Sequence, residues 1–240
     1  MTDTIIPATD PDATAAIAAI HSGDTEALTR IVEANPHLIK ASIERPGAAR
    51  SLIFVAVDWP GHFPNVAATI TLLARAGADV NAQLPPHPKT PEWRETPLHQ
   101  AASSNDVAAI DALLDAGGDI NAPGAVFTGG TPLSDAVIFA NWNAARRLVE
   151  RGARVEWWQG AALGMLEATK TRWTQSPPPA PQEVNSALWH ACRAAQRSTA
   201  EFLLAQGGDP DWLGWDHKTP RRVADESGDA DFVAWLRAKM

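Results

Sequence analysis

A short glycine-containing segment recurs along the chain where helical stretches end. It reads GADVNA at 77–82, GGDINA at 117–122, GARVEW at 152–157 and GGDPDW at 207–212. Glycine suits the left-handed residue that ends a helix. Two helical stretches open on Thr-Pro-Leu, at Thr96 and Thr131, which lie 35 residues apart. A spacing in this range predicts an array of similar helix-pair units stacked side by side.

The segment 96–122 shows how one unit is built. Thr96 can cap the first helix, and Pro97 fits the first turn, where a missing N–H costs nothing. Ile110, Leu113 and Leu114 recur at helical spacing and form the apolar stripe of the second helix. One unit cannot bury this stripe by itself, so it must stack against neighbours.

Aligned on the terminal glycine, the same stripe occurs in the other units, of which 156–185 is the least regular. We therefore expect one domain over 1–240. It would have an N-terminal capping unit at about 10–45, units near 50–95, 96–130, 131–155, 156–185 and 186–218, and a C-terminal capping unit at 219–240. The first helix is expected over 14–21, and the proline-rich segment 176–182 is expected to be a connector without regular structure.

The segments TPLHQAASSNDVAAIDALLDAGGDINA, TPLSDAVIFANWNAARRLVERGARV and TPRRVADESGDADFVAWL resemble ankyrin repeats, and the remaining units extend this similarity over nearly the whole chain. The chain is similar to the compact, stand-alone ankyrin repeat proteins of bacteria. The resemblance implies an all-α solenoid of about seven helix-pair units with short β-hairpin fingers. It also implies binding of another protein on the concave face and the finger tips. The family has no common catalytic residues, so none is assigned.

Composition narrows the classes of partner. The net charge of −8 and a pI near 5.3 argue against nucleic acid or an anionic membrane as a main partner. No run of about 18 apolar residues is present, so no membrane span is expected. The N-terminal residues lack the basic and apolar regions of a secretory signal. One cysteine, Cys192, rules out an internal disulfide and fits a reducing compartment, so we expect a cytoplasmic protein.

Two loops depart from the repeat. Residues 58–65 are inserted between the two helices of the second unit, and the loop 83–95 is about seven residues longer than a standard hairpin. Long loops within a compact scaffold are often functional. The indoles of Trp59 and Trp93 in these loops either cover apolar surface at the edge of the stack or contact a ligand, and the sequence leaves both open.

A row of polar residues is expected on the concave face, which the first helices line. The residue before the small-residue pair of each first helix gives Gln100, Asp135, Gln159 and His190, and the next inward position adds Ser103, Ile138, Ala162 and Arg193. Tryptophans flank this row in the sequence. Such a row is either solvated surface that contacts a protein or the polar part of a small-molecule pocket.

Motifs for known chemistry are missing from the sequence. It has no GxSxG, HExxH or GxGxxG pattern, and its seven histidines form no close cluster, so neither a metal nor a cofactor is expected. His99 is expected to bond neighbouring backbone, and Cys192 to be a small packed residue. Two repeats separate Asp135 from His190, roughly 20 Å, which is too far for a direct hydrogen bond.

Two functional hypotheses follow. The first, which the sequence favours, is a soluble interaction module for a protein or peptide. Its expected binding residues are Trp59, Trp93, Arg94, Gln100, Ser103, Asp135, Trp142, Gln159, His190, Arg193, Trp212 and Trp215. The alternative is a small-molecule binder or an atypical enzyme with a pocket roofed by 58–65. Its acid–base residues would be Asp58, His62, Asp135 and His190.

Overall fold

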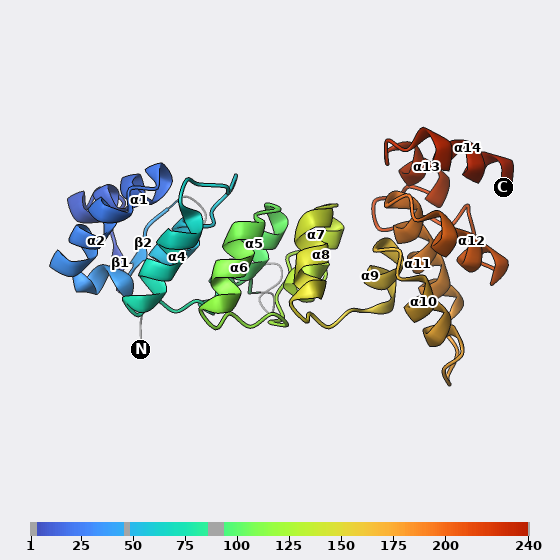
Figure 1. Ribbon diagram of the computed structural model, residues 1–240, viewed down its shortest axis with the longest axis horizontal. Coiled ribbons are helices and arrows are strands. Elements are labelled where there is room, and N and C mark those ends of the chain that lie inside the picture. The colour runs from blue at the N-terminus through green and yellow to red at the C-terminus, as the bar shows by residue number, and fades with distance from the viewer. Residues whose placement is uncertain (1–3, 46–48, 86–93, 240) are drawn as a thin grey trace. The chain divides into compact units, whose positions relative to one another are not determined.

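A computed structural model describes residues 4–45, 49–85 and 94–239. Within these ranges the chain forms seven pairs of short helices that follow one another along the sequence (Figure 1). Internal contacts divide the chain into two compact units, unit 1 (Met1–Ala153) and unit 2 (Arg154–Met240). The described residues are mostly helical, which confirms the predicted all-α repeat solenoid. The single domain over 1–240 stays a prediction.

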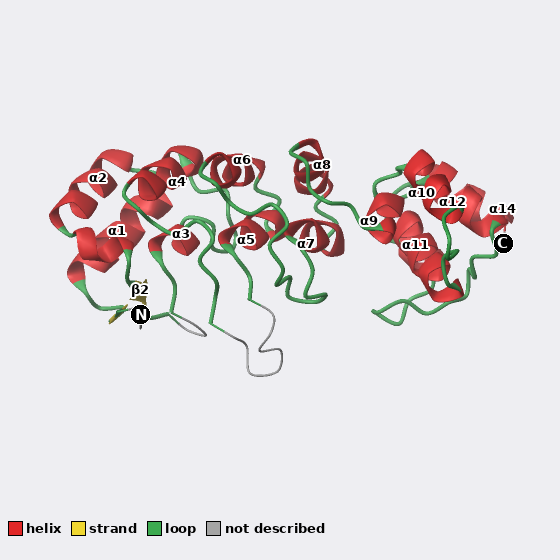
Figure 2. Ribbon diagram, turned by 90° about the horizontal axis from the view of Figure 1, so that it is seen from below, coloured by secondary structure: helices red, strands yellow, loops and turns green. Residues whose placement is uncertain are grey.

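Unit 1 is a two-layered stack of four helix pairs. The first helices, α1 (Pro11–Ser22), α3 (Leu52–Val55), α5 (Pro97–Ser103) and α7 (Pro132–Ile138), form one layer. The second helices, α2 (Thr25–Ala34), α4 (Val66–Arg75), α6 (Val107–Asp115) and α8 (Trp142–Glu150), form the other (Figure 2). A short 3-10 turn, η1 (Pro36–Ile39), follows α2. The loop that leads into α7 lies on the side of the first helices, away from the second helices.

Local capping signals set the helix ends in unit 1. The side chains of Asp10, Asp24 and Asp106 each accept a hydrogen bond from the backbone N–H three residues on, at 2.9, 2.9 and 3.0 Å. The first helix therefore begins at Pro11, three residues before the predicted start, because Asp10 caps it and proline fits its first turn. Gly117 has φ +94°, as expected for the glycine that ends a helix.

Two short strands lie outside the helical layers. β1 (Ile5–Ile6) pairs in parallel with β2 (Ser42–Ile43), so that Ile6 lies opposite Ile43, and both of these side chains are buried. Ile43 also forms an antiparallel bridge with Arg50. This sheet was not predictable from the sequence, because its strands are two residues long and join segments far apart in the chain.

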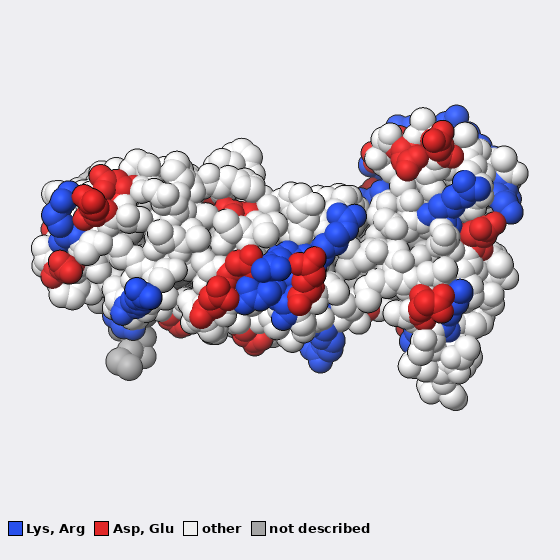
Figure 3. All heavy atoms as spheres, in the orientation of Figure 1, with Lys and Arg blue, Asp and Glu red and all other residues white. Residues whose placement is uncertain are grey.

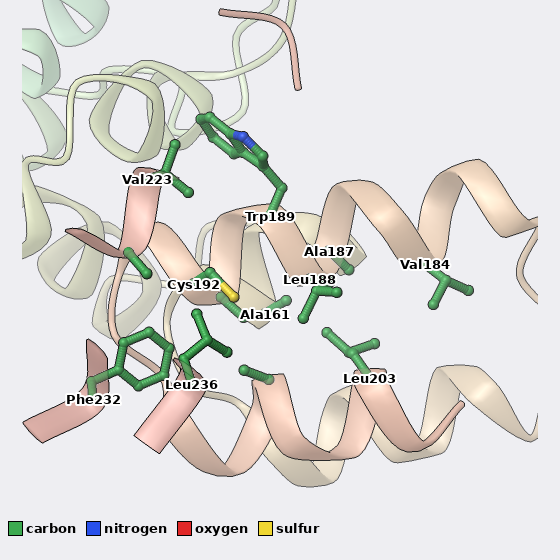
Figure 4. Close-up of a cluster of buried hydrophobic side chains, with 13 residues drawn as sticks. Ala161, Val184, Ala187, Leu188, Trp189, Cys192, Leu203, Val223, Phe232 and Leu236 are labelled. Carbon is green, nitrogen blue, oxygen red and sulfur yellow. The ribbon is translucent and has the colours of Figure 1, made fainter. Parts of the chain in front are cut away.

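Unit 2 contains α9 (Trp157–Ala162), α10 (Leu166–Trp173), α11 (Pro181–Arg193), α12 (Arg197–Ala205), α13 (Pro220–Asp225) and α14 (Ala230–Lys239). Its core gathers Leu188, Trp189 and Cys192 of α11 with Phe232 and Leu236 of α14 (Figure 4). Burial raises the pKa of the Cys192 thiol to about 12, so this cysteine is a packed, protonated side chain, as predicted.

The proline-rich connector before α11 is shorter than the expected 176–182. The helix begins at Pro181, inside that segment. Proline is tolerated in a first turn, and the Glu183 carboxylate accepts a hydrogen bond from the Ala180 backbone N–H at 2.7 Å. These two features start the helix earlier than composition suggested.

Candidate functional site

The insertion 58–65 lies along the edge of unit 1 where the two helices of each pair are joined. The backbone N–H of His62 donates to Asp106 Oδ2 at 2.8 Å, and its ring Nε2 lies 2.9 Å from the Ser104 carbonyl oxygen. In the other direction, Asn65 Nδ2 donates to the Gly23 carbonyl oxygen at 2.9 Å. The insertion thus joins the turn of the first helix pair to the turn of the third.

The insertion makes further contacts with residues that precede it in the chain. Asp58 is hydrogen-bonded to Arg50 and lies 3.7 Å from Arg45, and the Phe63 ring stacks on the His21 ring at 4.5 Å. Trp59 projects from the loop with 80% of its surface exposed. Neither Gln100 nor Asp135 is among the contacts that the structure describes for this loop, so its part as the roof of a pocket stays a prediction.

The polar row of unit 1 is placed by α5 and α7. Gln100 Nε2 donates to Glu95 Oε2 at 2.9 Å, and the Ser103 hydroxyl donates to the carbonyl oxygen of its own helix at His99, at 3.0 Å. Asp135 is buried, with 1% of its surface exposed. It therefore lies beneath the surface of this face, whereas Gln100 and Ser103 are half-buried.

The Asp135 carboxyl is the most perturbed acid of this region. Burial and then the charge of Glu95 raise its pKa well above the usual value. The nearby Val126 backbone amide acts against this rise, and it is the donor that the structure describes beside the two otherwise unpaired carboxyl oxygens. Burial also raises the pKa of Glu95, against the Gln100 hydrogen bond and the charge of Arg50. The protonated form is thus favoured more at both carboxyls than at an exposed acid.

Gly124 brings the loop before α7 next to the loop before α5. Its φ is +134°, and a β-carbon at this position would collide with the Arg94 carbonyl oxygen. This close approach places Glu95, the next residue of the chain, beside the loop 122–130 that leads to Asp135. The two acids come from different repeats and meet because the two loops lie against each other.

Exposed apolar side chains adjoin the buried acid. Phe139 follows Asp135 by one helical turn, and its backbone N–H donates to the Asp135 carbonyl oxygen at 2.9 Å. Its ring lies 5.7 Å from that of Phe127, between centroids, and the two residues are 42% and 53% exposed. With Val126, these residues form what we term the acid–aromatic face: Glu95, Gln100, Val126, Phe127, Asp135 and Phe139.

His99 joins two neighbouring repeats below this face. Its Nδ1 accepts a hydrogen bond from the Thr96 backbone N–H at 3.1 Å, so the proton is on Nε2, which donates to the Gly130 carbonyl oxygen at 3.3 Å. Burial lowers the pKa of His99 to about 4, so the ring is neutral near pH 7. His99 thus bonds backbone, as the sequence predicted.

In unit 2, Gln159 and His190 of the predicted row are buried, and His190 packs between aromatic rings. Gln159 Oε1 accepts a hydrogen bond from the Glu156 backbone N–H at 2.8 Å, and Gln159 is fully buried. The His190 ring lies 4.5 Å from the Trp158 ring and 4.8 Å from the Trp189 ring. Burial, and then the charge of Arg193, lowers its pKa to about 3, which keeps this histidine neutral.

The other predicted binding residues are spread over both units. Arg94 is exposed beside Gly124, and Trp142 is half-buried at the start of α8. Trp212 packs partly on the core of unit 2, Trp215 contacts the Trp189 ring, and the Arg193 guanidinium carbon lies 5.7 Å from the Trp189 ring centre. Trp93 lies outside the described residues. Asp135 belongs to unit 1 and His190 to unit 2, and their roles as acid–base residues stay predictions.

Unit 2 also has two adjoining hollows, of about 480 and 470 Å³. Glu156, Trp157 and Arg172 line both of them, and the Arg172 guanidinium carbon lies 6.0 Å from the Trp157 ring centre. The lining residues of these hollows include none of the predicted binding residues. Over the ranges 4–45, 49–85 and 94–239, no group of three His, Cys, Asp or Glu side chains could hold a metal ion. No described helix is long and apolar enough to cross a membrane.

The stacked helix pairs, four of which are followed by a glycine with positive φ (Gly77, Gly117, Gly152 and Gly207), define a helical repeat protein. Residues 53–156 match the family described as ankyrin repeats, in three copies. This segment therefore consists of ankyrin repeats, and repeats of this kind generally act as protein-interaction modules. A search of curated proteins finds no match.

Of the acid–aromatic face, the sequence predicted Asp135 and Gln100 as binding residues but not Glu95, Phe127 or Phe139. One signal was available for Phe139, which stands four residues after Asp135 and so shares its side of the helix. Another was the apolar pair Val126-Phe127 in a glycine-rich loop, where polar residues are the rule. Nothing local marked Glu95, because it meets Asp135 through the fold of two loops.

Proposed function

We propose that this chain binds a protein or peptide through the acid–aromatic face of unit 1. The observation that supports this most is the exposed ring pair of Phe127 and Phe139 next to the buried Asp135 carboxyl. At protein interfaces, the residues that dominate binding are typically aromatic side chains surrounded by polar groups. The face lies on a first helix and on the loop that precedes it, the surfaces that the family resemblance predicts.

The placement of other exposed apolar side chains gives further support. In unit 2, Leu213 and Trp215 are exposed on the loop that leads into α13, the same place in the repeat as Val126 and Phe127 before α7. Apolar groups exposed repeatedly at one place in a repeat are better explained by contact with partners than by packing within the chain. A cytoplasmic location remains part of the proposal, carried by the single buried cysteine Cys192.

The experiment selects peptides from a random phage-displayed library on the immobilised full chain and measures their affinity for variants. Phe127→Ala and Phe139→Ala should each weaken binding by about tenfold or more, as expected for interface anchors. Ile5→Ala, which truncates another exposed apolar side chain of unit 1, is the matched control and should change affinity little. Peptides that bind all three variants like the wild type would contradict the proposed surface.

The alternative hypothesis, an acid–base enzyme or small-molecule binder, makes a different prediction. It requires a proton carrier next to Asp135, and the titratable neighbour that the structure describes there is a second acid, Glu95. Thermal-shift screening of a metabolite set against the wild type and Asp135→Asn separates the two hypotheses. A metabolite that stabilises only the wild type would favour a small-molecule site.

A further inference from the structure

Asp135 is a carboxyl that the protein buries with little more than the Val126 backbone amide beside it. Asp135 has 1% of its surface exposed, and both of its side-chain oxygens lack a hydrogen-bond donor among the described residues. Buried polar groups in folded proteins are nearly always satisfied, and an ionised carboxylate in this state is strongly unfavourable. An exception of this kind calls for a functional explanation.

Glu95, the second acid of the site, also has few partners. Glu95 accepts one hydrogen bond, from the neutral amide of Gln100 at 2.9 Å. The cation that acts on Glu95 is Arg50, whose guanidinium is hydrogen-bonded to Asp58 of the insertion. Within the described part of unit 1, the two carboxyls therefore face the neutral amides of Gln100 and Val126 and each other, and the one cation that acts on Glu95 is shared with Asp58.

A pair of aromatic rings adjoins the two acids. The Phe127 and Phe139 rings, 5.7 Å apart, are partly exposed beside the two acids. A ligand that reaches the carboxyls would also contact these rings. A free cation or a small amine would leave them uncovered, whereas a peptide can carry a cation and an apolar group on neighbouring residues.

We propose that Glu95 and Asp135 receive a basic side chain, Lys or Arg, of the partner, while an apolar residue next to it packs on Phe127 and Phe139. This inference rests on the proposed function and names the chemistry of the partner. The net charge of −8 agrees with it, because an acidic chain attracts basic segments. A divalent metal is a poorer occupant, since no third His, Cys, Asp or Glu joins these carboxyls in the described residues.

Proton release is a consequence of this arrangement. Without a partner, the raised pKa of Asp135 favours the protonated form, and a bound ammonium or guanidinium favours the carboxylate. Binding of the basic side chain should therefore release a proton into the solvent. Titration calorimetry in two buffers with different heats of ionisation measures that proton. A surface that only packs against the peptide would give the same heat in both buffers.

The experiment continues the peptide selection on the full chain. Selected peptides should contain Arg or Lys next to an apolar residue. Replacing that arginine by citrulline, or that lysine by norleucine, removes the charge and should weaken binding to the wild type by about tenfold or more. The same replacement should have little effect on Asp135→Asn, and Glu95→Gln should give an intermediate result. Asp12→Asn, on the exposed side of α1, changes the net charge equally and should behave like the wild type.

The outcomes separate the two proposals. Peptides that depend on Phe127 and Phe139 but lack a basic residue, or that tolerate citrulline, would overturn this inference and leave the proposed function standing. No enrichment over a blank surface would contradict both. If the chain self-associates in sedimentation experiments and Asp135→Asn abolishes that self-association, the face binds a second copy of the chain. That result would overturn the inference. If Asp135→Asn did not fold, the peptide replacements and Glu95→Gln would still test whether the two acids bind a basic side chain.

Discussion

The backbone N–H of His62 donates to Asp106 Oδ2 at 2.8 Å, while Asp106 Oδ1 accepts the N–H of Ala109 at 3.0 Å. One carboxylate therefore caps α6 and also holds the insertion 58–65 against the following repeat. Because this contact and that of Asn65 with Gly23 engage turns on both sides of the second helix pair, the insertion acts as a brace along the stack.

Replacing Asp106 should therefore lower the free energy of unfolding more than replacing an ordinary helix cap does. Asp106→Ala removes the cap and the brace and should lower the free energy of unfolding by about 2–4 kcal/mol. Asp24→Ala is the matched control, since Asp24 caps α2 through Ala27 in the same way and is exposed. Asp24→Ala should lower the free energy of unfolding by about 1 kcal/mol. Urea unfolding of the two variants measures the difference, and equal losses would argue against the brace.

Asp135 should make the protein less stable as the pH rises. Its pKa is raised in the folded state, so the folded chain keeps a proton that the unfolded chain has lost above about pH 4. Its contribution to stability therefore decreases from that pH up to the raised pKa. Asp135→Asn should melt at a higher temperature than the wild type at about pH 8, and the difference in melting temperature should be smaller at about pH 4. A variant less stable at both pH values would contradict the buried unpaired carboxyl.

His99 should have the opposite pH dependence. Its pKa is lowered to about 4 by burial, so its stabilising contribution is complete above about pH 6.5 and is lost as the pH falls towards 4. The full loss is on the order of 3 kcal/mol. His99→Gln keeps an acceptor for the Thr96 N–H, as Gln159 provides for Glu156, but does not titrate. In urea unfolding, the variant should be less stable than the wild type near neutral pH. The difference in free energy of unfolding between the two should decrease as the pH is lowered.

A row of alternating charges crosses the second helices α6 and α8 (Figure 3). Asp111 accepts from Arg147 at 2.8 Å and from Arg151 at 2.6 Å, so it joins two neighbouring repeats. Burial acts to raise the pKa of Asp111, but the hydrogen bonds from both arginines outweigh it and lower that pKa. Because these groups are partly exposed, Asp111→Asn should lower the melting temperature modestly at low salt and less at high salt. Glu167→Gln, which breaks a pair within α10, should have a smaller effect.

Local signals made most of the fold predictable. A proline in the first turn, such as Pro97, and a helix-ending glycine, such as Gly117, act within a few residues of their position, so the sequence locates them directly. The pairing of Ile6 with Ile43 could not be found this way, because it joins distant segments. The proximity of Glu95 to Asp135 has the same origin, since it depends on how the loop at Gly124 lies against Arg94.

The most direct test of the central claim is hydrogen–deuterium exchange of the full chain with and without a selected peptide. If the acid–aromatic face is the binding surface, the peptide should slow exchange in the loop 122–130 and in α7, and leave α6 and α8 unchanged. Slower exchange restricted to α6 and α8, or to unit 2, would contradict the claim that this face binds the partner.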